Sequence, residues 1–498
     1  MKSRIDELDL ELLPRSRTVE DGVEWALARA GEALQLVIGV PSGGEKLLDE
    51  FEGRTEGDTN GTVLVGPASA RNAAGLRGRL DWLRPRPLGT ATSAGLGDRL
   101  GLATPGHVRA VRSAGGAGLR PIFAQQSIRE MSRTGRTPIE VMDDATWGVF
   151  GEGWREGVGA DADHLKTPED VDGCLAAGFS FFTIDPGDHV DSSADSADAG
   201  ALRAAVAALP WPELEDTEDG LRTRHLDRTV VVEGHELRFD EETLLRAAAK
   251  YGRAVAHVAR MERHLRRAAG ARAVELEVSV DETETPTTPA EHYWVASELK
   301  RLDVAWVSLA PRFVGRFEKG VDYIGDLDEL EADLAAHAAI ARRLGPYKLS
   351  LHSGSDKFSV YPIAARQTRG LVHLKTAGTS YLEALRTVAA LDPGLFREIY
   401  AFARDRYETD RASYHVSARL DRAPGVDEVP ESGLASLLEQ FDAREILHVT
   451  FGSVLTERST EGGLRFYDAL MGLLRAHPEA YAGNLETHFV RHLRPLVR

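Results

Sequence analysis

The chain has 498 residues, of which 42% are hydrophobic and 28% charged, an ordinary composition for a globular protein with a sizeable core. Its 60 Lys and Arg face 78 Asp and Glu, so the net charge is -18. This charge argues against nucleic acid and anionic membranes as partners, because both repel an acidic protein. The sequence has no apolar leader and no stretch of ~20 apolar residues, so we expect a cytoplasmic protein.

The first 87 residues are predicted to form an N-terminal extension that contains β-structure. Apolar runs at 34–40 and 62–66 are separated by acidic and Gly-rich sequence, as is typical of strands. The Pro-rich stretch 83–87 then blocks regular helix and sheet. We therefore place a boundary there, between an extension over 1–87 and a larger domain over 88–498.

In the larger domain, short apolar strands alternate with helix-start signals. Thr104-Pro105, Thr137-Pro138 and Thr167-Pro168 each offer a capping hydroxyl followed by a proline suited to the first turn. This alternation predicts an α/β fold with a parallel sheet, and the number of strands predicts a closed (β/α)8 barrel of the TIM type. Nine candidate strands compete for eight places, namely 91–95, 122–125, 160–164, 181–185, 274–280, 304–309, 348–352, 371–374 and 446–451.

Two long stretches interrupt this pattern, near 190–241 and 411–437. The first is rich in Asp, Ser and Ala at its start, and the second contains Pro424 and Pro430. We interpret both as insertions or loops over the barrel.

The stretch 274–281 places polar side chains inside the predicted barrel. Alternation turns the valines toward the helices and puts Glu275, Glu277, Ser279 and Asp281 on the inner face. A buried carboxylate without a partner is costly, so it requires protonation, a cation or a metal. The strand is therefore a candidate for chemistry, with a structural ion network as the alternative.

Four histidines lie at predicted strand ends, where a barrel holds its functional groups: His164, His352, His373 and His448. Imidazole and carboxylate together suit a catalytic divalent metal, and Zn, Mn, Co and Ni are all compatible. The single cysteine excludes a thiolate-rich site. Any one histidine alone would more often be structural, so the prediction of a metal rests on the group.

Cations gather after the same strands, which in a net-acidic protein indicates an anionic substrate such as a carboxylate-bearing sugar. Salt bridges to neighbouring acidic residues are the alternative. The cations are Lys166, Arg312, Lys357 and Lys375, with Arg99 and Arg129 nearby.

Five long segments carry a family resemblance: 95–107, 159–167, 182–189, 352–359 and 373–380. They resemble segments of the tagaturonate epimerases, and the likeness extends from about residue 95 to residue 455. The resemblance implies a divalent-metal enzyme of hexuronate catabolism that interconverts tagaturonate and fructuronate by inverting the carbon two positions from the ketone.

The position of that carbon shapes the expected mechanism. It is β to the carbonyl, so its own hydrogen is not acidified, and direct proton exchange is disfavoured. In a retro-aldol route, a base removes the hydroxyl proton, the bond to the α-carbon breaks, and the aldehyde re-adds from its other face. A metal would stabilise the enediolate, while a side-chain acid and base move the proton.

With this chemistry in view, His164, His352 and His373 are the expected metal ligands, with Glu318 in reserve. Asp163 and Glu277 are the expected acid and base. Strict alternation puts Asp163 and His164 on opposite faces, so both point inward only if the strand has already ended. The expected substrate contacts are Lys166, Lys357 and Lys375, together with Arg99, Gln125 and Asp356.

Other activities are compatible with the same residues. A metal-dependent sugar aldolase, or an epimerase of neutral or phosphorylated ketoses, would use the same metal and base. A non-catalytic sugar-acid sensor is the alternative outside the enzymes. In the favoured interpretation the partner is a small keto-uronate, and the sequence leaves the oligomeric state open.

Overall fold

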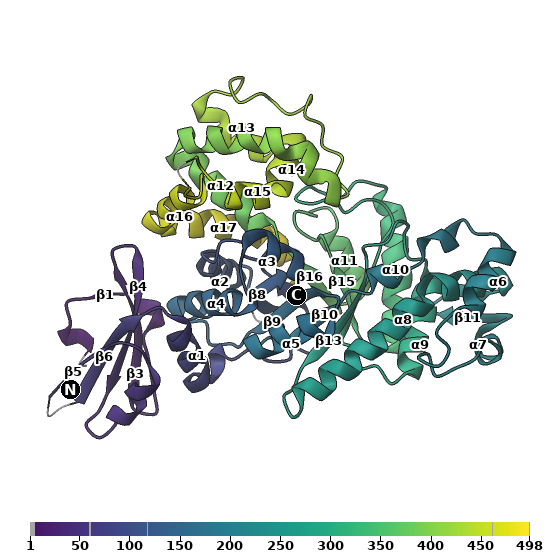
Figure 1. Cartoon of the computed structure of the whole chain (residues 1–498), viewed down its shortest axis with the longest axis horizontal. Helices are drawn as coiled ribbons and strands as arrows, with labels where there is room; N and C mark the ends of the chain where they lie inside the picture. The colour runs from purple at the N-terminus through teal and green to yellow at the C-terminus, as the bar shows by residue number, and fades with distance from the viewer. Residues whose placement is uncertain (1–4, 59–60, 117, 461, 498) are drawn as a thin grey trace.

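The computed structural model describes residues 5–58, 61–116, 118–460 and 462–497. Eight parallel strands close into a barrel in the order β10-β13-β14-β15-β16-β7-β8-β9, which confirms the predicted (β/α)8 fold (Figure 1). The barrel strands are β7 (Ser93–Gly95), β8 (Arg120–Ser127), β9 (Gly159–Leu165), β10 (Phe181–Ile184), β13 (Glu275–Val280), β14 (Ser308–Pro311), β15 (Lys348–Leu351) and β16 (Val372–Lys375).

The ninth candidate strand is helical. Residues 446–451 fall in α14 (Phe441–Val449) and α15 (Phe451–Thr456), so this strand prediction was wrong. The run is buried as its apolar character suggests, but a short apolar run does not distinguish a buried strand from a buried helix. The strand expected at 304–309 also begins later, at Ser308.

Helices surround the barrel. Of the three Thr-Pro pairs that predicted a helix N-cap, two supply one. The side chains of Thr137 and Thr167 cap α4 and α5 in reciprocal capping boxes. Thr104 is instead the first residue of α2 and makes no cap, because the helix begins one position earlier than the Thr-Pro pattern indicates. The surrounding helices are α2 (Thr104–Ser113), α3 (Ile128–Thr134), α4 (Pro138–Glu152), α5 (Pro168–Ala177), α8 (Glu241–Ala269), α9 (Pro289–Arg301), α10 (Leu327–Leu344) and α11 (Tyr361–Thr368).

An antiparallel sheet precedes the barrel and lies at one end of the molecule (Figure 1). The two apolar runs noted in the sequence fall in β4 and β6, which pair with each other. Helix α1 (Ala70–Arg79) follows the sheet and packs on α4, which also contacts β3. The strands are β1 (Glu11–Leu12), β2 (Thr18–Glu20), β3 (Val23–Ala30), β4 (Ala33–Val40), β5 (Arg54–Asp58) and β6 (Gly61–Pro67).

The stretch between β10 and β13 carries its own secondary structure, at the opposite end of the molecule from the N-terminal sheet (Figure 1). It contains α6 (Ala199–Ala207), α7 (Glu218–His225) and a hairpin of β11 (Arg228–Val232) with β12 (His235–Phe239). Helix α6 packs on α8, β12 packs on α8 and α9, and β11 packs on α10.

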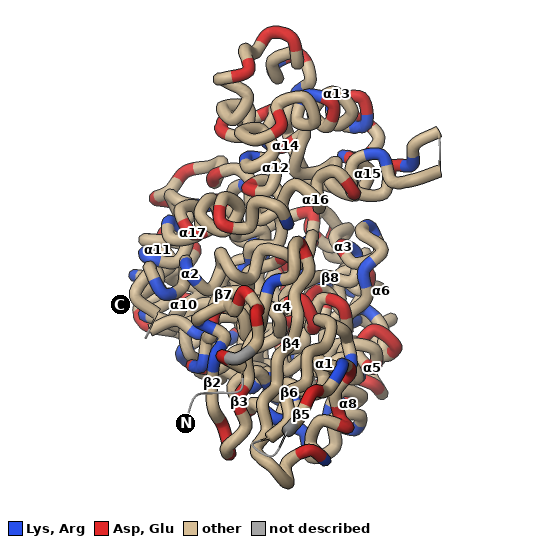
Figure 2. Tube along the Cα trace, turned by 90° about the vertical axis from the view of Figure 1, so that its left-hand side faces the viewer, with Lys and Arg blue, Asp and Glu red and all other residues tan. Residues whose placement is uncertain are grey.

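A layer of C-terminal helices stands on one side of the barrel in both views of the chain (Figures 1 and 2). It comprises α12 (Thr379–Leu391), α13 (Pro393–Asp410), α14, α15, α16 (Tyr467–Ala476) and α17 (Pro478–Leu493). The second long stretch, near 411–437, joins α13 to α14 within this layer. Among the described residues, no helix combines the length and apolar character needed to cross a membrane.

Candidate active site

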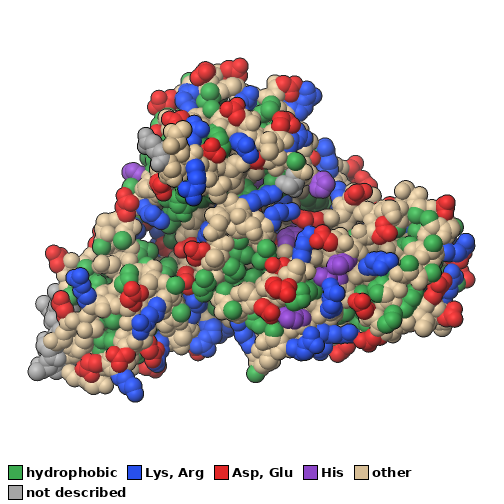
Figure 3. Space-filling view, in the orientation of Figure 1, with side chains coloured by type: hydrophobic (Ala, Val, Ile, Leu, Met, Phe, Trp, Pro, Cys, Tyr) green, Lys and Arg blue, Asp and Glu red, His purple; other side chains and the backbone are tan. Residues whose placement is uncertain are grey.

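A cavity lies at the carboxyl ends of the barrel strands, the end at which barrel enzymes carry their active sites. Histidine side chains appear near the middle of the molecular face in Figure 3, where the C-terminal helices meet the barrel. Residues from β9, β16, the loops after β14 and β15, and the C-terminal layer line the cavity. They include Asp163, His164, Lys319, His352, Lys375, Tyr414 and His448.

Lys375 stands among three buried carboxylates below this cavity. Its Nζ lies 2.6 Å from Asp163 Oδ1, 3.0 Å from Asp161 Oδ2 and 2.8 Å from Glu277 Oε1. It also donates to Thr183 Oγ1 at 2.6 Å. Burial lowers the pKa of Lys375, but the carboxylates outweigh burial and raise it above its ordinary value. The amine therefore stays charged, and one cation is shared by three anions.

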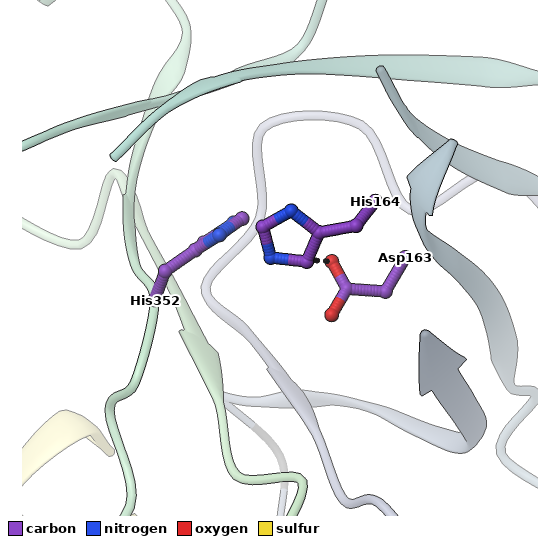
Figure 4. Close-up of side chains that lie close together, drawn as sticks. All are labelled: Asp163, His164 and His352. Carbon is purple, nitrogen blue, oxygen red and sulfur yellow. Dashed lines mark ion pairs between the residues drawn. The ribbon is translucent and has the colours of Figure 1, made fainter. Parts of the chain in front are cut away.

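Two imidazoles meet above this group, with ring centres 5.1 Å apart (Figure 4). His164 Nδ1 lies 3.1 Å from Asp185 Oδ2. His352 lies between two carboxylates, with Nε2 2.7 Å from Glu277 Oε1 and Nδ1 3.1 Å from Asp281 Oδ1. Burial lowers the pKa of both rings, but the neighbouring carboxylates outweigh it and raise the pKa to about 10 for His164 and about 9 for His352.

Asp163 and His164 are neighbours in sequence, yet both line the cavity (Figure 4). Strict alternation requires the strand to end before these two residues if both are to point inward. The strand does not end there, because β9 continues to Leu165. His164 instead adopts a left-handed backbone conformation with φ 54°, and the register between β9 and β10 shifts at this level. This irregularity turns consecutive side chains to the same side.

The residues around the cavity fit a divalent cation. Ligand atoms of Asp163, His164 and His352 lie within 4.8 Å of one another, and two imidazoles with a carboxylate suit such a metal. Glu277 Oε2 is buried and, in the described part of the chain, has no hydrogen-bond partner. The excess of buried carboxylates over Lys375 has to be balanced by protonated imidazoles or by a bound cation.

The other two predicted ligands lie outside this group of ligand atoms. His373 is deeper in the barrel, with Nδ1 2.9 Å from Ser93 Oγ and Nε2 3.8 Å from Asp161 Oδ2. Glu318 accepts hydrogen bonds from the backbone N and Oγ of Ser417, at 2.8 and 2.7 Å.

Three predicted substrate contacts lie at the site. Lys375 and Arg99 line the cavity, and buried Gln125 has Nε2 3.3 Å from Asp163 Oδ2. Arg99 is already paired, because its Nε donates to Glu130 Oε1 at 3.0 Å. Its guanidinium also stands 3.5 Å from the centre of the Phe451 ring.

The other three predicted contacts have partners elsewhere. Lys166 is at the surface and pairs with Asp188 at 2.7 Å. Lys357 is buried, and its amine donates to three backbone carbonyl oxygens at 2.7, 2.5 and 2.9 Å. Asp356 pairs with Arg444 at 2.9 Å in a network with the C-terminal helix α17.

Two cavity residues that come from long loops, Lys319 and Tyr414, are not predicted by the sequence patterns. Both lie far from a strand end in sequence, and no local pattern marks them. His448 was singled out as a strand-end histidine, but it reaches the cavity from helix α14.

A sequence model of the tagaturonate epimerases matches residues 15–496. The chain belongs to this family. The tagaturonate/fructuronate epimerase of Thermotoga maritima is 42% identical over 489 residues, which cover 97% of this chain and 96% of that protein. Native and glycerol-complexed crystal structures of fructuronate-tagaturonate epimerase UxaE from Cohnella laeviribosi match with a TM-score of 0.92 and 39% identity. These matches cover 99% of this chain and 98% of the Cohnella laeviribosi chain. The family resemblance seen in the sequence is therefore confirmed.

Proposed function

We propose that this epimerase interconverts tagaturonate and fructuronate, the keto-uronates for which its relatives are named. The observation that carries the proposal is the group of Asp163, His164 and His352 at the carboxyl end of the barrel. The chain around this group matches the family over nearly its whole length. This group combines a carboxylate that can take a proton with side chains that can hold a cation.

The proposed cofactor is a divalent cation, Zn, Mn, Co or Ni, held by Asp163, His164 and His352. When bound, such a cation supplies Lewis-acid stabilisation of negative charge on the substrate's oxygens. Asp185 is suited to orient His164 through its contact with Nδ1. Binding through a nitrogen of His352 requires that ring to give up one of its two carboxylate contacts.

In the proposed mechanism, Asp163 would hold the cation through one carboxylate oxygen and accept, through the other, the proton of the hydroxyl on the carbon that is inverted. Burial raises the pKa of Asp163, but the charges of Lys375, His164 and His352 outweigh it and lower the pKa below the ordinary value. The carboxylate is therefore ionised, and its low pKa makes it a weak base that readily returns any proton it takes up. The bond to the α-carbon then breaks, the aldehyde turns over and re-adds, and Asp163 returns the proton to the new hydroxyl oxygen.

Glu277 was expected to share the acid and base chemistry, but its position favours a positioning role. It is fully buried and bonds His352, Lys375 and Thr183 through the same oxygen, Oε1. We propose that Glu277 orients His352 and Lys375.

The test is turnover of tagaturonate by purified protein, followed by NMR. We expect fructuronate to form, a chelator to abolish the reaction, and added Mn, Co, Ni or Zn to restore it. Full activity of demonstrably metal-free protein would contradict the cofactor. Net release of a three-carbon fragment would indicate an aldolase, and binding without turnover under every metal would indicate a sensor.

A further inference from the structure

Among the described residues, Lys319 is a cation of the cavity that no carboxylate contacts directly. It lies in the loop between β14 and α10 and lines the same cavity as Asp163, His164 and His352. Within the residues that the structure describes, its amine makes neither a hydrogen bond nor an ion pair. A partly buried ammonium group without a partner is costly unless a ligand supplies the anion.

The neighbouring cations of the cavity are already neutralised. Arg99 pairs with Glu130, and Arg129 Nη2 lies 2.8 Å from Glu282 Oε1. Lys375 is held by its three carboxylates. Of the lysines and arginines that line this cavity in the described ranges, Lys319 is thus the one without an ion pair.

The backbone that carries Lys319 is anchored on both sides. Lys357 Nζ donates to the carbonyl oxygens of Glu318 at 2.7 Å and Val321 at 2.5 Å. Arg444 donates to the carbonyl oxygen of Gly320. Gly320 has φ 74°, and a Cβ at this position would lie 2.7 Å from His448 Cδ2, so the loop packs closely on α14. Such anchoring lowers the entropy that Lys319 loses when it binds a ligand.

The surroundings of Lys319 also favour an anion. Burial is the main reason that the pKa of its amine is lowered, and the positive charge of Arg129 adds to this, while the carboxylates of Glu282, Glu130 and Asp281 offset it only in part. A carboxylate placed against the amine would stabilise its charged form and gain a charge-assisted hydrogen bond.

We propose that Lys319 binds the carboxylate of the substrate and thereby selects keto-uronates over neutral ketoses. The assignment rests on the proposed function for the identity of the substrate. Lys319 thereby takes the carboxylate-binding role that was expected for Lys166 and Lys357. The amine of Lys166 pairs with Asp188, and the amine of Lys357 donates to backbone carbonyls.

The kinetic test compares tagaturonate with tagatose, which has a hydroxymethyl group in place of the carboxylate. In Lys319→Met, kcat/KM for tagaturonate is expected to fall by about 10- to 100-fold, the range for loss of a charged hydrogen bond. For tagatose, the ratio of variant to wild type is expected to stay within about threefold, because that substrate has no charge for Lys319 to bind. Lys319→Arg should recover part of the loss on tagaturonate.

Arg316→Met is the matched control, since it removes a positive charge from the same loop. Arg316 is exposed and pairs with Glu318 at 3.3 Å. It shares an adjoining cavity with Lys319 but does not line the cavity of Asp163, His164 and His352. Its kcat/KM for tagaturonate should stay close to that of the wild type. A loss as large as that of Lys319→Met would show that net charge, and not direct contact, is responsible, and would overturn the proposal.

A binding measurement separates this proposal from the proposed function. Galactonate, a six-carbon acid without a ketone, and the neutral galactitol are titrated calorimetrically into wild-type protein and Lys319→Met. We expect the wild type to prefer the acid and the variant to lose that preference. If this occurs while tagaturonate is not converted, the subsite stands and the proposed function fails. Equal losses on tagaturonate and tagatose, a retained preference for galactonate in the variant, or no preference in the wild type would overturn the subsite.

Discussion

At the scale of single residues, two of the three carboxylates that contact Lys375, those of Asp163 and Asp161, differ in their access to the cavity. Asp163 and Asp161 both contact Lys375, at 2.6 and 3.0 Å. Asp163 lines the cavity, whereas Asp161 is fully buried and does not. We therefore assign the proton transfer to Asp163 alone.

Asp163→Asn is expected to lower kcat by about 10²- to 10⁴-fold, because the amide cannot accept the hydroxyl proton. Asp161→Asn removes a similar contact with Lys375 and serves as control, with an expected loss below about tenfold. Steady-state kinetics on tagaturonate, with bound metal measured for each variant, compares the two. Similar losses in both would mean that the shared network, and not proton transfer by Asp163, is what matters.

Lys375 is expected to matter for stability more than for substrate contact. In Lys375→Met three buried carboxylates lose their cation, so the free energy of unfolding should fall by about 3–5 kcal/mol. Lys166→Met, which removes an exposed ion pair, should change it by less than about 1 kcal/mol. Urea denaturation measures both. A Lys375→Met protein as stable as the wild type would contradict the view that Lys375 neutralises the cluster.

The sequence indicated several residues of the site but not their partners. Asp163, His164, His352 and Lys375 could be identified because barrel strands deliver polar residues at their carboxyl ends. Lys357 is also a lysine that follows a barrel strand, yet its amine donates to backbone carbonyls, and only the folded loops determine which of these roles a lysine takes.

At the scale of elements, His107 links three helices. It lies in α2, its Nε2 is 2.8 Å from Ser380 Oγ of α12, and its ring packs at 4.6 Å on Phe489 of α17. Burial is the main reason that its pKa is lowered to about 4. Below pH 6.5 the unfolded chain therefore binds a proton that the folded chain refuses, and stability falls as the pH drops toward 4.

His107→Gln keeps a donor for Ser380 but cannot take up this proton. Between pH 6.5 and 4 the wild type loses up to about 3 kcal/mol through His107, at about 1.4 kcal/mol per pH unit. The variant should therefore lose less stability between pH 7 and 5, as measured by urea denaturation at each pH. Parallel pH dependence of the two proteins would mean that His107 is not held neutral in the fold.

Local patterns predicted some elements and failed for others that look alike. Thr137-Pro138 and Thr167-Pro168 mark true helix caps, whereas Thr104-Pro105 lies inside its helix. The run 446–451 is as apolar as a barrel strand but packs as a helix against α12 and α13. Tertiary packing decided both cases, and a single sequence does not contain that information in local form.

At the scale of the whole molecule, the alternation of strands and helices was sufficient to predict the barrel, because parallel strands need crossover connections. The layer of α12 to α17 was not anticipated as a unit. It completes the site, since Tyr414 and His448 reach the cavity from the C-terminal part of the chain. The cavity is thus built from segments far apart in sequence.

We propose that this chain inverts one carbon of a keto-uronate by breaking and remaking the bond to the α-carbon. Conversion of tagaturonate in deuterated water, followed by NMR of the product, tests it most directly. We expect fructuronate that carries no deuterium at the inverted carbon, because the hydrogen on that carbon never leaves. Stoichiometric deuterium at that position, or the absence of fructuronate with added Mn, Co, Ni and Zn, would contradict it.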